Sequence, residues 1–204
     1  LDKGQILIYA SSGSVYGSTN ITSVEDVPLK FKPINNYDLT KYSLDVHAEK
    51  FIQNGYNIIG LRFGTVNGWS PNIREELMIN SMTKKAIREG SISINNKTIK
   101  RPILGISDIS KAMTKIIEKP ISGVYNLASF NDTVQSISTY ISNSLDANIE
   151  ETINISGAYD FNMSTDKFQS EYNFNFDESI ESIVNELVDK DNNYSNRNIY
   201  IKYE

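Results

Sequence analysis

The chain has 204 residues, of which 39% are hydrophobic and 22% are charged, as is typical of a globular protein with one domain or two small lobes. Its formal net charge is −5 and it has no Lys/Arg-rich run, which argues against nucleic acid as a partner. With no cysteine and one histidine, a disulfide framework, a thiolate metal site and a His-rich metal site are excluded, and no metal is predicted. No apolar run approaches the roughly 20 residues of a membrane span. The first residues also lack the layout of a signal peptide, so we expect no membrane partner and predict a cytoplasmic location.

The first third of the chain predicts a strand, a helix and a second strand. QILIYAS (5–11) is a short apolar run followed by Ser and Gly, the pattern of a parallel strand buried on both faces, and NIIGLRFG (57–64) repeats it. The spacing between them predicts a helix over 37–54. The residues expected to face inward on this helix are Leu39, Ser43, Val46 and Phe51. Strand, helix and strand in this order predict a parallel crossover.

The remaining two thirds predict helices that alternate with short strands. Gly90 and Pro120 each end a helix, and Ser107 with Asp108 is expected to cap the helix that Pro120 ends. The expected elements are helix 73–88, strand 92–94, helix 108–118, strand 123–129, helix 134–144, a strand region at 151–155, and helices 165–172 and 177–188, before a polar, Asn-rich tail.

Tyr37 and Lys41 carry the first chemical signal. They lie four residues apart in the expected helix, which places them on one face about a turn from each other. They follow a core strand that leads into SSGSVYG (11–17). This ordered pattern of Ser, Tyr and Lys is far more specific than a Tyr-Lys pair alone.

The segments YASSGSVYG, YDLTK and LRFGTVNG together resemble the catalytic half of the extended short-chain dehydrogenases/reductases, the NAD-dependent epimerase/dehydratase family. The later segments KRPILGISDI and GVYNLA are also similar to that family, so the resemblance covers essentially the whole chain. It implies an α/β fold with a partial Rossmann-like parallel sheet and an interleaved, smaller α/β substrate domain. The implied dinucleotide-binding domain is 1–68, with 105–129 returning to it, and the implied substrate-binding domain is 69–104 and 130–204.

The resemblance assigns catalysis to Ser12, Tyr37 and Lys41. Free tyrosine titrates near pH 10, so a tyrosine base at neutral pH needs positive charge beside it. Lys41 can supply part of that charge, and in the family the matching lysine also bonds the nicotinamide ribose. Alignment on VYG selects Ser12, and not Ser11, as the hydroxyl that bonds the reacting sugar oxygen.

The same resemblance implies NAD or NADP as cofactor, with NAD favoured, and a nucleotide-sugar as substrate. Arg101 falls where the family places an arginine against the nucleotide diphosphate, a role that suits a guanidinium group. The residues expected to contact the cofactor are Ser11, Tyr37, Lys41, Phe63, Gly64, Thr65 and Val66. The residues expected to contact the substrate are Ser12, Gly13, Ser14, Thr65, Arg74 and Arg101.

Gly13 and Ser14 bear on the reaction type. The 4,6-dehydratase branch of the family carries an Asp-Glu pair at these positions, and without the two carboxylates the elimination of water loses its acid and base. We therefore expect an epimerase or a keto-reductase, and a dehydratase is the less favoured hypothesis. The alternative outside catalysis is a dinucleotide-sensing or scaffold protein with the same fold, since a fold does not determine a function.

The dinucleotide fingerprint GxxGxxG does not occur in the chain. Relatives carry roughly a hundred residues before the segment that begins here, and these hold most of the cofactor site. We therefore expect a fragment that is inactive alone, and the enzyme prediction applies to its full-length parent. Family members commonly dimerise through the helix that carries YxxxK, which implies a homodimer through residues 37–54.

Overall fold

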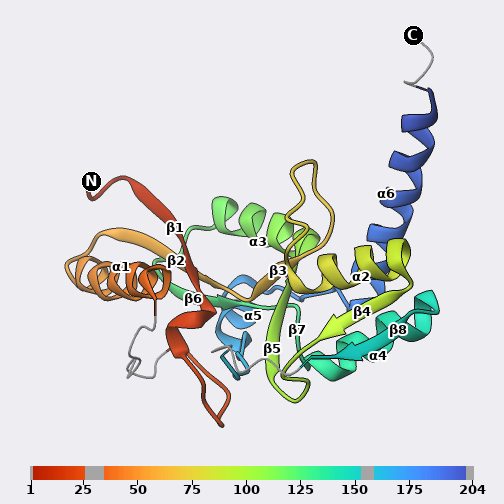
Figure 1. Cartoon of the computed structure of the whole chain (residues 1–204). Coiled ribbons are helices and arrows are strands. Elements are labelled where there is room, and N and C mark those ends of the chain that lie inside the picture. Colours follow the sequence, from red (N-terminus) through yellow and green to blue (C-terminus); the bar gives the residue numbers. More distant parts are fainter. Residues whose placement is uncertain (1, 26–34, 153–158, 201–204) are drawn as a thin grey trace.

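The computed structural model describes residues 2–25, 35–152 and 159–200, and its side chains up to residue 191. A three-stranded parallel sheet lies at the amino-terminal side of the molecule (Figure 1). Its strands, in spatial order, are β1 (Ile6–Ser12), β2 (Asn57–Phe63) and β6 (Gly123–Leu127). The α/β fold and the parallel crossover from β1 to β2 are therefore confirmed.

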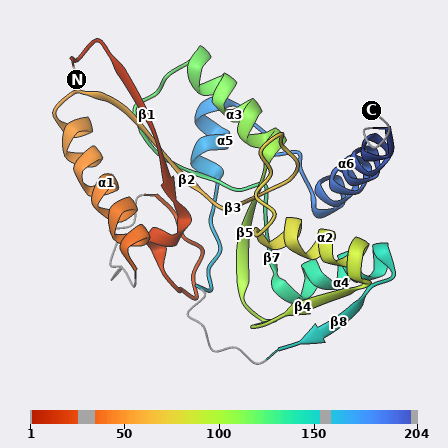
Figure 2. The same ribbon diagram turned by 45° about the horizontal axis from the view of Figure 1, so that its top comes forward.

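Helices cover both faces of this sheet. Neighbouring side chains of β2 point to opposite faces, so they pack against different helices. Ile58 packs with Ala48 of α1 (Asn36–Gln53), whereas Ile59 packs with side chains of α3 (Ile106–Glu118) and α5 (Asp166–Tyr172). The layers are visible in Figure 2, where α1 lies on one side of β1 and β2, and α3 and α5 lie on the other.

The second lobe is built on two smaller sheets. In one, β5 (Lys100–Gly105) pairs parallel with β3 (Thr65–Asn67) and antiparallel with β7 (Phe130–Thr133); in the other, β4 (Ser91–Ile94) pairs parallel with β8 (Asn148–Glu151). Their core is closed by three helices: α2 (Met78–Glu89), α4 (Val134–Leu145) and α6 (Ile180–Tyr200). In the described ranges, no helix is both long and apolar enough to cross a membrane. The domain boundaries stay a prediction. Helix α5, which falls in the predicted substrate-binding domain, packs against the three-stranded parallel sheet of the first lobe.

Several predicted boundaries were wrong. The helix expected from Ile73 begins at Met78, because the Asn67 side chain accepts a hydrogen bond from the Ile79 N–H and so meets the start of α2 there. The last helix, expected at 177–188, begins at Ile180 and runs on to Tyr200, through the polar, Asn-rich tail. The strand expected at 151–155 is β8, which ends at Glu151, and residues 153–155 lie outside the described residues. The short strands β3, β5 and β7 were missed.

The start of α3 is capped differently from the prediction. Gly105 is its N-cap residue, and the Glu178 carboxylate accepts hydrogen bonds from the backbone N–H groups of Ser107 and Asp108. Asp108 is fully buried and in turn accepts from the N–H groups of Asp177 and Glu178. Burial raises the pKa of Glu178. This reciprocal pair joins α3 to the segment that leads into α6.

Two predictions of burial were also wrong. β1 was expected to be buried on both faces, but Ile6 and Leu7 at its start are exposed. β1 is also an edge strand, since no described strand pairs with its other side. On α1, Leu39 and Phe51 were expected to face inward, yet both are 48% exposed. The helix buries Asp38, Asp45 and Ala48 instead.

Asp45 anchors α1 to the sheet. Its carboxylate accepts a hydrogen bond from Tyr9 on β1 at 3.0 Å, and it forms a 2.8 Å ion pair with Arg62 on β2. The two charged side chains are 1% and 5% exposed. Arg62 also donates to the Tyr16 hydroxyl, which donates to Asn126 on β6. One buried polar chain therefore links α1 to all three strands of the sheet.

We predict that Asp45→Asn destabilises the protein by about 3–5 kcal/mol, because it leaves the buried Arg62 guanidinium without its counter-charge. The free energy of unfolding, measured by urea denaturation with circular dichroism, tests this. The matched control is Glu151→Gln, which removes the exposed partner of Lys97 and is expected to cost less than about 1 kcal/mol. Equal losses in the two variants would contradict the anchoring role of Asp45.

Candidate active site

A cavity of about 510 Å³ opens where β1 and β2 end and the chain passes into β3. This is the carboxyl edge of the parallel sheet, where ligands bind in open α/β folds. The cavity brings together every site residue predicted from the sequence except Gly13. Its wall also includes four residues that the sequence did not indicate: Ala10, Leu77, Tyr159 and Phe161.

Ser12 is oriented by the turn that it begins. It is the N-cap of the short 3-10 turn Gly13–Tyr16, and its Oγ accepts hydrogen bonds from the N–H and the hydroxyl of Ser14, at 3.2 and 3.0 Å. Because Oγ accepts both, its own proton remains to be donated into the cavity. The hydroxyl of the buried neighbour Ser11 has no hydrogen-bond partner among the described residues.

Tyr37 and Lys41 come from the first turns of α1, which Asn35 caps by accepting from the Asp38 N–H. The Lys41 ammonium donates to the backbone oxygen of Ala10 at 2.7 Å and lies 5.5 Å from the centre of the Tyr37 ring. Lys41 thus reaches from α1 to the strand end beside Ser11 and Ser12. Tyr37 is 57% exposed and lines the same cavity.

Gly13 does not line the cavity, contrary to its predicted role in substrate binding. It is buried, and a Cβ atom there would lie 2.7 Å from the Met163 sulfur and 3.1 Å from the Phe161 ring. Gly13 therefore allows these two side chains to pack against the turn.

Gly64 has a related steric role in the cavity wall. A Cβ atom at Gly64 would lie 2.8 Å from the backbone oxygen of Pro102, so the link between β2 and β3 can pass this close to β5 only without a side chain.

Arg101 is a partly buried cation with neutral partners. Its guanidinium donates to the Thr65 hydroxyl at 3.3 Å and to the backbone oxygen of Tyr159 at 3.2 Å. No carboxylate of the described residues forms an ion pair with it. Burial lowers the pKa of Arg101. Such a cation fits an anionic ligand group, which would supply the missing counter-charge.

Arg74 differs from Arg101 in its surroundings. It lies at the cavity rim, 68% exposed, in a 2.8 Å ion pair with Glu76. An exposed pair of this kind is weak, so Arg74 can exchange Glu76 for a ligand.

Tyr159 connects the two ends of the site. Its hydroxyl donates to the buried Asp38 carboxylate at 2.6 Å, and its backbone oxygen accepts from Arg101. It lies 121 residues after Asp38, and no local motif marks it. Only the fold brings Tyr159 to α1.

The wall fits the nicotinamide end of a dinucleotide. The unpartnered Ser11 hydroxyl, the Lys41 side chain and the segment 63–66 all line the cavity, and these are residues expected to contact the cofactor. For metal ions the donor set is poor: across the residues whose placement is described, no group of three His, Asp or Glu side chains could hold one.

Comparison with known proteins agrees with this architecture. The model of the NAD dependent epimerase/dehydratase family matches residues 2–156. Protein CapI of Staphylococcus aureus is 32% identical over 121 residues, which cover 58% of this chain and 35% of that protein. An ADP-L-glycero-D-manno-heptose-6-epimerase of Brachyspira hyodysenteriae is 31% identical over 144 residues, 64% of this chain and 43% of the relative. The chain therefore spans less than half the length of these two relatives.

Solved structures share the fold at low identity. A dTDP-glucose 4,6-dehydratase of Bacillus anthracis has a TM-score of 0.78 at 22% identity and covers 90% of this chain and 60% of its own. A UDP-glucuronic acid 4-epimerase of Bacillus cereus has a TM-score of 0.77 at 21% identity, over 89% and 60% of the two chains. Since the family model covers three quarters of the sequence and the fold agrees, the chain belongs to the NAD dependent epimerase/dehydratase family.

Proposed function

We propose that the natural protein carrying this chain is an NAD(P)-dependent nucleotide-sugar epimerase or keto-reductase. The observation that carries this proposal is the single cavity that joins Ser12, Tyr37 and Lys41 with the partly buried Arg101. A proton-transfer group, a hydrogen-bond donor and a cation for an anionic ligand thus face one space.

Tyr37 is the acid/base of this mechanism. Its phenolate removes the proton of the sugar hydroxyl during oxidation, and its phenol returns a proton in the reductive direction. The Lys41 ammonium, fixed on the Ala10 carbonyl, stabilises the phenolate. Ser12, whose oxygen is held by Ser14, donates a hydrogen bond to the reacting sugar oxygen.

NAD, which we favour over NADP, supplies the hydride acceptor and donor when bound. Lys41 and Ser11 are placed to hold its ribose side, and Phe63, Gly64 and Val66 to line the ring side, with Thr65 between cofactor and sugar.

Substrate binding is assigned to two arginines and three small polar residues of the same cavity. Arg101 and Arg74 would bind the diphosphate of a nucleotide-sugar, since guanidinium groups suit bidentate binding of phosphate. Ser12, Ser14 and Thr65 would contact the sugar. This substrate class is supported by two similar proteins described above, an ADP-L-glycero-D-manno-heptose-6-epimerase and a UDP-glucuronic acid 4-epimerase.

Gly13 and Ser14 argue against a dehydratase. Neither residue offers the acid and base that eliminate water. An acidic side chain at Gly13 would also displace Met163 and Phe161.

A non-catalytic dinucleotide sensor remains the alternative from another class, and cofactor binding without turnover would favour it. The chain by itself is proposed to be inactive, because it lacks the GxxGxxG fingerprint. The cytoplasmic location stays a prediction.

We predict that Tyr37→Phe in the full natural protein lowers turnover by about 10²–10⁴-fold, because the proton-transfer group is lost while the ring is kept. Turnover is measured by product NMR on a panel of UDP-, GDP-, CDP- and dTDP-sugars with NAD and NADP. Tyr42→Phe is the matched control, since Tyr42 lies on the same helix outside the cavity wall. Full turnover in Tyr37→Phe would rule out this mechanism.

We also propose that α1 forms a homodimer interface. Leu44 and Phe51 lie seven residues apart on α1 and are 39% and 48% exposed. This spacing places them along one face of the helix. An exposed apolar stripe of this kind fits the matching stripe of a second copy.

Leu44→Glu is therefore expected to convert the dimer to a monomer, because it places a charge within the stripe. Light scattering after size-exclusion chromatography measures the mass. Ile117→Glu on α3, where Ile117 is 68% exposed, is the control that should leave the dimer intact. A monomeric wild-type protein would refute the interface.

A further inference from the structure

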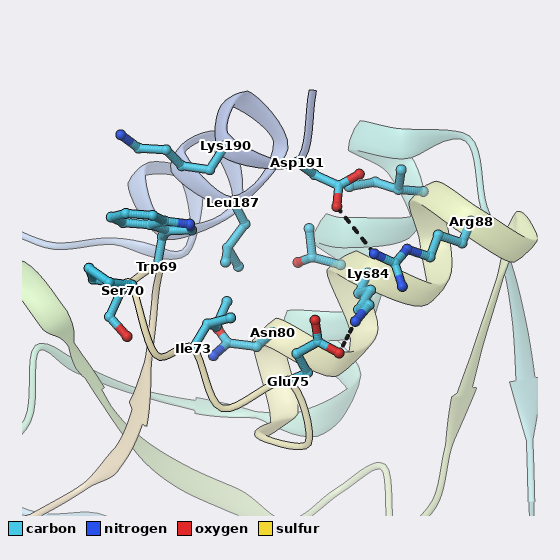
Figure 3. Close-up of a pocket in the computed structure, with 13 residues that line it drawn as sticks. Trp69, Ser70, Ile73, Glu75, Asn80, Lys84, Arg88, Leu187, Lys190 and Asp191 are labelled. Carbon is cyan, nitrogen blue, oxygen red and sulfur yellow. Dashed lines mark ion pairs between the residues drawn. The ribbon is translucent and has the colours of Figure 1, made fainter. Parts of the chain in front are cut away.

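A second cavity, of about 330 Å³, lies between the segment from Trp69 to Glu75, helix α2 and helix α6 (Figure 3). It shares no lining residue with the catalytic cavity. It belongs to the second lobe, away from α1 and β1 (Figure 1). Its volume is at the lower end of the range for small-molecule sites, about 300–1,000 Å³.

One wall of this cavity is aromatic and apolar. Trp69 forms one side, and Ile73 and Leu187 lie close to it. The Lys190 ammonium lies over the Trp69 ring, 4.7 Å from its centre. No described carboxylate forms an ion pair with Lys190. A flat apolar group that entered here would find a ring to pack on and a cation beside it.

The lining carries three cations and two carboxylates. Lys84 pairs with Glu75, and Arg88 reaches Asp191 at 3.6 Å while 55% exposed, as the dashed lines in Figure 3 show. With Lys190 the lining has a surplus of one positive charge, although the chain as a whole carries −5. The long, exposed Arg88 pair is weak and can exchange its carboxylate for a ligand anion.

Thr83 adds an unmatched donor to the lining. It is 1% exposed, and its hydroxyl has no hydrogen-bond partner in the part of the chain that the structure describes. The side-chain amide of Asn80, in contrast, accepts a hydrogen bond from the Gly68 N–H and donates to the backbone oxygens of Gly68 and Arg74. A buried hydroxyl without a partner is costly, so Thr83 would gain from an acceptor in the cavity.

We propose that this cavity is a second binding site, which takes a small organic anion with a carboxylate or phosphate on a flat apolar body. The apolar body packs on Trp69 and Leu187. The anionic group lies among Lys190, Arg88 and the Thr83 hydroxyl, where donors exceed acceptors. The inference is independent of the proposed enzymatic function, because it uses none of the catalytic residues.

Trp69 is the single tryptophan of the chain, so its fluorescence reports on this cavity alone. The full chain is titrated with phenyl phosphate and with benzoate, and each affinity is checked by calorimetry. Saturable binding of either probe supports the site, and the tighter of the two identifies the preferred anionic group. Phenol lacks the anion and inorganic phosphate lacks the flat body, so both should bind at least tenfold more weakly.

Lys190→Gln should weaken binding of the better probe about tenfold, the effect of one lost charge-assisted contact. Thr83→Val removes the unpartnered hydroxyl at constant shape, keeps the fold and should also weaken binding. Lys85→Gln is the matched control, since Lys85 lies on α2 outside the lining and loses the same charge. The proposal is overturned if neither probe binds, if phenol binds as tightly, or if Lys190→Gln and Lys85→Gln behave alike.

Discussion

The buried ion pair between Asp45 and Arg62 is the constraint on which the geometry of the candidate active site depends. Asp45 lies one helical turn after Lys41 and two turns after Tyr37, so fixing its carboxylate on β2 also fixes the rotation of α1. The same carboxylate accepts from Tyr9 on β1, close to Ser11 and Ser12. The distance between α1 and the strand ends is thus set by hydrogen bonds of defined length, which an apolar contact could not specify as closely.

The local part of the site could be predicted from the sequence. Ser12 follows an apolar strand, and Tyr37 and Lys41 share a helical face, so spacing alone places them correctly with respect to their own elements. The strands β2 and β6 and the helices α3 and α4 were predicted for the same reason, because a periodic apolar pattern is a local property. Arg101 and Thr65, expected at the cavity from the resemblance, do line it.

The predictions that were wrong or missing concern features that depend on contacts between residues far apart in the sequence. Leu39 and Phe51 were expected to be buried on the rule that apolar side chains face inward, but Asp38 and Asp45 take that face because Tyr159 and Arg62 meet them there. β3 was missed because its pairing with β5 joins residues nearly forty positions apart. The cap of α3 comes from Glu178, about seventy residues away, and no pattern near Ser107 indicates it.

Arg62 and Arg101 differ in whether a carboxylate balances their charge, and this difference bears on whether each is structural or open to a ligand. Burial alone lowers the pKa of Arg62, but Tyr16 and Asp45 outweigh it and the net shift is upward. Arg101 has only neutral partners among the described residues, and burial lowers its pKa. A compensated cation gains little from a further anion, whereas an uncompensated one gains much. Arg62 therefore serves the framework, and Arg101 keeps its unmet charge directed at the cavity where an anionic ligand would bind.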